Sequence, residues 1–167
     1  NELRGYFIDE GGFLSSMDQP AEVSVLEQGP LFVKVAVKGK IGKYSFTQTI
    51  RLTQGEPRID MSVKLDWIGS PRIGEPGIEF RADNPRKSFY DDRYKLLVYL
   101  PIQIANQQIY KDAPFDVCES RLENTFFNRW DSIKHNIILN WVDVASKDNS
   151  CGLSLFTDHT TSYAHGK

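Results

Sequence analysis

The sequence predicts an all-β fold, an antiparallel β-sandwich, and two observations lead to this prediction. Apolar and polar side chains alternate with a period of two through several segments, as in strands with one buried and one solvated face. Short turns that contain Gly and Pro separate these segments, while strong helix-forming stretches are scarce. The chain of 167 residues has the length of one domain, so residues 1–167 are predicted to form a single β-sandwich domain.

The clearest strand is predicted at 58–67, where odd-numbered residues are apolar and even-numbered residues are polar or charged. Its apolar side consists of Ile59, Met61, Val63, Leu65 and Trp67. Trp67 completes this side and is therefore predicted to be a core residue. The same alternation predicts three more strands, at 33–38, 44–52 and 94–100. Two further runs, at 136–145 and 153–157, carry apolar residues on both faces and are predicted as more deeply buried strands.

The connections between these strands are predicted from their turn residues. Residues 39–42 form a short hairpin link between the strands at 33–38 and 44–52, and residues 54–57 form the next link. The stretch 69–88 contains three prolines and three glycines and is too long for a tight hairpin, so we expect an excursion from the sheet.

Composition and charge exclude some classes of partner. The formal net charge is -2, whereas a protein that binds a phosphate backbone needs a basic surface. No apolar run is long enough to cross a bilayer. We therefore expect a soluble protein whose partners are neither nucleic acid nor membrane. The compartment stays undetermined, although the lack of glycosylation sequons and the presence of only two cysteines favour a bacterial source.

Six segments carry a further signal through their order and spacing. They lie at 1–12, 26–67, 93–102, 112–120, 138–144 and 152–166. The second is a hairpin series that ends in Asp66-Trp67, and the last reads as a strand followed by a polar loop. Together these segments resemble the C-terminal β region of glycoside hydrolase family 38, the α-mannosidases.

The resemblance implies a supersandwich similar to galactose mutarotase-like domains, with further strands after position 167. It also implies a retaining α-mannosidase, in which the carboxylate nucleophile and a zinc ion belong to an N-terminal catalytic domain whose motifs this sequence lacks. We therefore expect no catalytic residue, no metal and no cofactor in this chain, with zinc implied for the missing domain. The implied partners are that catalytic domain and mannose-containing glycans.

Truncation of a sandwich also has a mechanical consequence. Because the implied later strands are missing, we expect an unpaired sheet edge or an uncovered apolar face. The exposed sheet edge favours a dimer.

A loop after the last predicted strand supplies most of the candidate sugar-binding residues. Asp158, His159 and Tyr163 have side chains that can hydrogen-bond to a mannose ring or stack on it, and loops at sheet ends often carry function. The alternative is a loop that only seals a domain interface. His159 and His165 lie six residues apart beside Asp158, a poor match to metal-ligand spacing, so no metal site is predicted.

Trp130 is the other candidate for substrate binding, because aromatic rings pack on sugar faces. Paired with Tyr163, it would form the exposed platform of an independent carbohydrate-binding β-sandwich module, which is the alternative to the role as a supporting domain.

Overall fold

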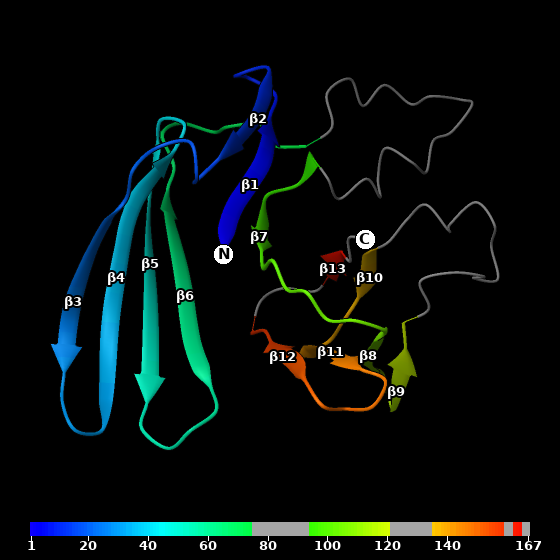
Figure 1. The fold of residues 1–167 in the computed structure, drawn as a ribbon. Coiled ribbons are helices and arrows are strands. Elements are labelled where there is room, and N and C mark those ends of the chain that lie inside the picture. Colours follow the sequence, from blue (N-terminus) through cyan, green and yellow to red (C-terminus); the bar gives the residue numbers. More distant parts are fainter. Residues whose placement is uncertain (75–93, 121–134, 159–161, 165–167) are drawn as a thin grey trace, which may run out of the picture. The chain divides into compact units, whose positions relative to one another are not determined.

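A computed structural model describes most of the chain. The described residues are 1–74, 94–120, 135–158 and 162–164. In these ranges every regular element is a β-strand and every strand pairing is antiparallel (Figure 1), which confirms the predicted antiparallel all-β fold. The described residues divide into two compact units, one up to Leu100 and one from Pro101 onward. The single domain predicted for 1–167 stays a prediction, and each unit is described by itself.

The first unit contains two sheets. The larger has the order β3-β4-β5-β6 and consists of β3 (Glu22–Gln28), β4 (Phe32–Ile41), β5 (Tyr44–Thr53) and β6 (Ile59–Asp66). The smaller has the order β2-β1-β7 and consists of β1 (Glu2–Phe7), β2 (Gly12–Ser15) and β7 (Leu97–Tyr99). The strands predicted at 33–38, 44–52 and 58–67 are thus confirmed. The strand predicted at 94–100 is shorter, because only 97–99 pair with β1.

The hairpin between β4 and β5 corrects the predicted turn at 39–42. β4 continues to Ile41, which pairs with Tyr44, so the turn is only Gly42 and Lys43. Gly42 has a φ of 58°, a conformation that glycine adopts without strain. Gly39 has a different reason to be glycine: a Cβ there would lie 2.8 Å from the Phe46 ring.

The core of the first unit lies between its two sheets. Side chains from β1, β4 and β5 form it, namely Leu3, Phe7, Ile41, Tyr44 and Phe46. The Phe7 and Tyr44 rings are stacked, with their centroids 5.3 Å apart. Trp67 was predicted to be in this core, but it is 44% exposed, because it lies just past β6 and meets Tyr44 edge-on instead of filling the interior.

The second unit also contains two sheets. The larger has the order β12-β11-β8-β9 and consists of β8 (Gln107–Ala113), β9 (Asp116–Glu119), β11 (Trp141–Ser146) and β12 (Gly152–Phe156). The smaller pairs β10 (His135–Ile137) with β13 (Ser162–Ala164). Ile109, Ile138 and Val142 form its buried core.

The strand predicted at 136–145 is wrong as one element, because the structure divides it into β10 and β11. The side chain of Asp112 on β8 accepts hydrogen bonds from the backbone N–H groups of Leu139 (2.9 Å), Asn140 (2.7 Å) and Trp141 (3.2 Å). These donors cannot also join a strand ladder, so the chain turns at this point.

The strand predicted at 153–157 is present as β12, but it is not deeply buried. It lies at the edge of its sheet, and most of its residues are exposed, Phe156 to 72%. No helix in the described part of the chain is long and apolar enough to cross a membrane.

Candidate functional site

Within the described part of the first unit, exposed and half-buried apolar side chains occupy much of one face of the sheet β3-β4-β5-β6. Cross-strand pairing places Val25, Val35, Ile50 and Met61 in one row across the four strands. Val33, Leu52 and Ile59 form the neighbouring row. Both rows are on the same face as Phe46 and Tyr44, because side chains two residues apart share a face. We call this surface the apolar face; it consists of Val23, Val25, Val33, Val35, Ile50, Leu52, Ile59 and Met61.

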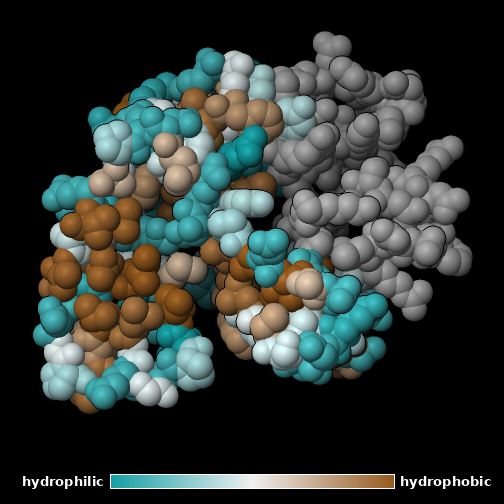
Figure 2. Space-filling view, in the orientation of Figure 1, coloured by the Kyte–Doolittle hydropathy of each residue, from teal (hydrophilic) through white to brown (hydrophobic). Residues whose placement is uncertain are grey.

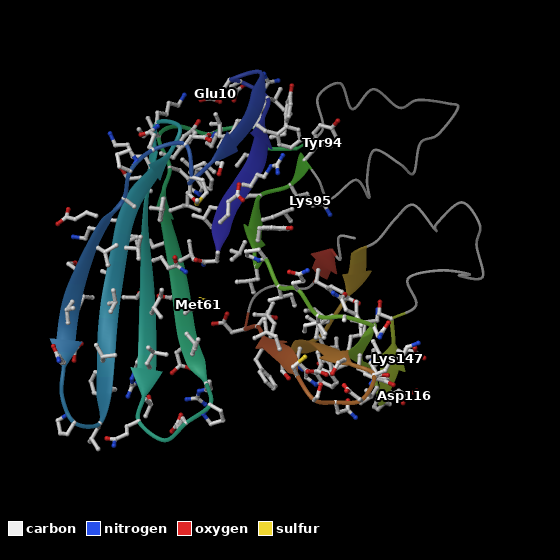
Figure 3. All side chains as sticks on the ribbon, in the orientation of Figure 1. Glu10, Met61, Tyr94, Lys95, Asp116 and Lys147 are labelled. Atoms are coloured by element: carbon white, nitrogen blue, oxygen red, sulfur yellow. The ribbon has the colours of Figure 1, made fainter. Side chains whose placement is uncertain are left out.

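The apolar face is open because the core covers only the end of the sheet near the β4–β5 turn. Val23, Val25, Leu52, Ile59 and Met61 are all exposed, and Val33, Val35 and Ile50 are half-buried. Figure 2 shows hydrophobic side chains gathered over this part of the sheet, and Figure 3 labels Met61 there, on β6.

The opposite face of the same sheet is polar. It carries Lys34, Lys38, Arg51 and Lys64, and Thr49 and Ser62 share a hydrogen bond of 2.6 Å across β5 and β6. The contrast between the two faces defines a surface suited to another apolar surface, because soluble proteins seldom expose a contiguous apolar patch without a partner. The alternation of apolar and polar residues in β6 identifies Ile59 and Met61 as members of this surface, but it does not predict that they are exposed.

None of the four sugar-binding residues predicted from the sequence belongs to the apolar face, and two of them lie outside the described ranges. His159 and Trp130 belong to residues that the structure does not describe. Asp158 is exposed and follows β12. The role in sugar binding predicted for Asp158, His159, Tyr163 and Trp130 stays a prediction.

Tyr163 lies on β13 and packs against the core of the second unit. Its buried hydroxyl makes no hydrogen bond that satisfies donor–acceptor geometry with the described residues. Burial raises the pKa of Tyr163, and the proximity of the Ser120 side chain offsets part of that rise. Packing of the Tyr163 ring against this core therefore stabilises the second unit.

The buried carboxylate of Asp112 is an anchor for the backbone. Burial alone would raise the pKa of Asp112, but hydrogen bonds from Trp141, Leu139 and Asn140 outweigh burial and hold it below its usual range. Because its oxygens are occupied by these donors, the side chain is poorly suited to proton transfer.

A second acidic side chain is held in the turn after β11. Hydrogen bonds from Ser146 and Ser150 lower the pKa of Asp148 to about 2. Across the described ranges, no group of three or more His, Cys, Asp or Glu side chains could hold a metal ion.

Fold and surface together define the class of protein: an antiparallel all-β domain with one large apolar face open to contact. The family model described as "Glycosyl hydrolases family 38 C-terminal domain" matches residues 8–166, nearly the whole chain. The chain therefore belongs to the C-terminal domain family of the family 38 glycosyl hydrolases, which confirms the resemblance seen in its six segments. No curated protein and no solved structure gives a significant match to it.

Proposed function

We propose that this chain is a non-catalytic C-terminal domain of a retaining α-mannosidase, which supports the catalytic domain and helps to shape the sugar-binding site. One observation carries the proposal: the apolar face is exposed in a domain that belongs to a glycosyl hydrolase family. Under this proposal the zinc ion belongs to the catalytic domain, and the substrates are mannose-containing glycans.

The chemistry of the apolar face favours a permanent partner over a sugar. Its eight side chains are all aliphatic or thioether groups, with no aromatic ring to stack on a pyranose. The adjacent polar side chain of Gln48 is buried and donates to the Met61 Sδ at 3.6 Å. Such composition is typical of the buried centre of obligate interfaces between domains or subunits. The catalytic domain of the same enzyme is the partner that this surface fits.

Charge placed on the apolar face is expected to prevent docking. The double variant Ile59→Lys, Met61→Lys would place two ammonium groups where two apolar side chains become buried. Burial of each side chain contributes about 1.5 kcal/mol or more, so affinity for the N-terminal catalytic part of the same polypeptide should fall by at least about 100-fold. Isothermal titration calorimetry of the two separately purified parts measures this loss.

The matched control is Ser45→Lys, which adds a charge to an exposed position of β5 on the opposite, polar face. This variant should bind the catalytic part as tightly as the wild type does. Equal binding by all three proteins, or no binding by the wild type, would show that the apolar face is not the docking surface.

The isolated chain is expected to be inactive. Retention requires two carboxyl groups about 5 Å apart across the glycosidic bond, and the resemblance assigns them to the catalytic domain. Purified chain incubated with an aryl α-mannoside should release phenol at the background rate. A rate that rises in proportion to the chain, in preparations free of other glycosidases, would overturn the assignment.

A further inference from the structure

The sheet β3-β4-β5-β6 has two outer strands, and they differ in how well another strand could pair with them. Within the described ranges neither β3 nor β6 has a second neighbour. β3 is interrupted by a bulge between Val25 and Glu27 and carries two glutamates, Glu22 and Glu27, features that protect an edge from pairing. β6 pairs with β5 without any interruption from Ile59 to Asp66, so its outer edge is straight, and no described strand pairs with it. We call this side of β6 the open edge.

The order of charges along this open edge is complementary to the same order read backwards. In order, 58–66 reads positive, apolar, negative, apolar, neutral, apolar, positive, apolar, negative. Read backwards, every positive position becomes negative and every negative position becomes positive, while the apolar and neutral positions stay unchanged. A sequence of this kind matches a second copy of itself that runs antiparallel.

We propose that two copies of this chain pair through β6, antiparallel, with Ser62 on the two-fold axis. Asp60 then lies opposite Lys64 of the second copy, and Arg58 lies opposite Asp66. On the other face, Ile59 meets Leu65 of the second copy. Met61 likewise meets Val63, so the two apolar faces join into one continuous surface.

The charges select this register over its neighbours. Side chains stay on matching faces only if the register shifts by two residues. A shift in one direction places Arg58 opposite Lys64 of the second copy, and a shift in the other places Asp60 opposite Asp66. Like charges directly opposite each other destabilise a strand pair, so the pairing centred on Ser62 is favoured.

The backbone of β6 is oriented for this pairing. Gln54, directly after β5, donates its N–H to the carbonyl of Leu31 at 2.8 Å, on the β4 side. Backbone groups alternate along a strand, so even-numbered residues of β5 face β4 and odd-numbered residues face β6. Thr49 therefore faces Ser62, and the backbone groups of Met61 and Val63 point to the open edge, where the second copy can bond them.

Ion pairs within each copy fit into the same arrangement. Arg58 lies 3.0 Å from Asp60, and Lys64 lies 3.2 Å from Asp66. In the paired register the Arg58–Asp60 ion pair of one copy lies opposite the Lys64–Asp66 ion pair of the second copy, with opposite charges facing each other. Both ion pairs within each copy therefore remain intact in the dimer.

Sedimentation equilibrium of the 167-residue chain tests the proposal by charge exchange. From roughly 1 µM to 1 mM, the mass of the wild type should rise from 19.1 kDa to twice that value. Asp60→Lys and Lys64→Asp each place like charges opposite each other at two symmetric positions, so each variant alone should associate at least roughly 10-fold more weakly. An equal mixture of the two variants should dimerise as the wild type does, because each then faces its opposite.

The double variant Asp60→Lys, Lys64→Asp should also recover the wild-type dimer, while Glu27→Lys on β3 should leave association unchanged. Far-UV circular dichroism confirms that the variants are folded before they are mixed. A monomeric wild type, a dimer that survives either single exchange, or folded variants that fail to recover in the mixture would each overturn pairing through β6.

Discussion

Replacing Phe7 with Ala is expected to lower the free energy of unfolding of the first unit by about 4 kcal/mol. Phe7 on β1 is fully buried, and its ring stacks on Tyr44 of β5, so it joins the two sheets of the unit. Truncation removes the buried ring and leaves a cavity that the flanking strands cannot close, and substitutions of this kind cost roughly 3–5 kcal/mol. Urea denaturation followed by circular dichroism measures the loss.

The control for this prediction is the same substitution at an exposed position. Phe156 is 72% exposed on the edge strand β12, so Phe156→Ala should change the free energy of unfolding by less than about 0.5 kcal/mol. Similar losses in both variants would mean that the packing of Phe7 between the sheets does not determine stability.

The sequence predicted the long strands of the first unit because their two faces meet different surroundings. β6 alternates apolar and polar or charged residues at every position from Ile59 to Asp66, and its predicted and observed bounds agree closely. The predicted turn began too early because glycine often indicates a turn, whereas Gly39 lies inside a strand, where the absence of a side chain leaves room for the Phe46 ring.

The strands of the second unit were harder to predict. Neither β8 nor β9 was predicted, because β8 has a single large buried aliphatic residue, Ile109, and a buried aspartate, Asp112. The division of 136–145 depends on that aspartate, which lies 27 residues before Leu139 in the chain. A contact over such a distance leaves no periodic signal in sequence.

The sequence predicts that the candidate surface is apolar, but not that it is exposed. Alternation identifies Ile59 and Met61 as members of an apolar row, but the same pattern would suit a buried face. They are exposed because the core of the unit extends along the sheet only as far as Val37 and Val63. That limit is set by how the two sheets overlap, which a period of two cannot encode.

Replacing Asp112 with Asn is expected to destabilise the second unit, although the two side chains are nearly the same size. In the wild type, carboxylate oxygens accept from the N–H groups of Leu139, Asn140 and Trp141. An amide has a single acceptor oxygen and directs its NH₂ group at a backbone donor, so buried N–H groups lose their partners. We expect the midpoint of thermal unfolding to fall by roughly 5–10 °C, measured by differential scanning calorimetry.

The effect of pH separates loss of the carboxylate charge from a general disturbance of packing. Because the pKa of Asp112 is lowered in the folded state, its stabilising effect is complete above the unfolded pKa of about 3.8 and is lost as pH falls through the folded pKa. The stability gap between wild type and Asp112→Asn should therefore narrow in acid. Asp116→Asn alters an exposed carboxylate that, among the described residues, accepts a hydrogen bond from the adjacent Val117 N–H, and this variant should show little gap at any pH. A gap for Asp112→Asn that stays constant with pH would mean that the ionised carboxylate does not hold the turn between β10 and β11, because only ionisation changes over this range.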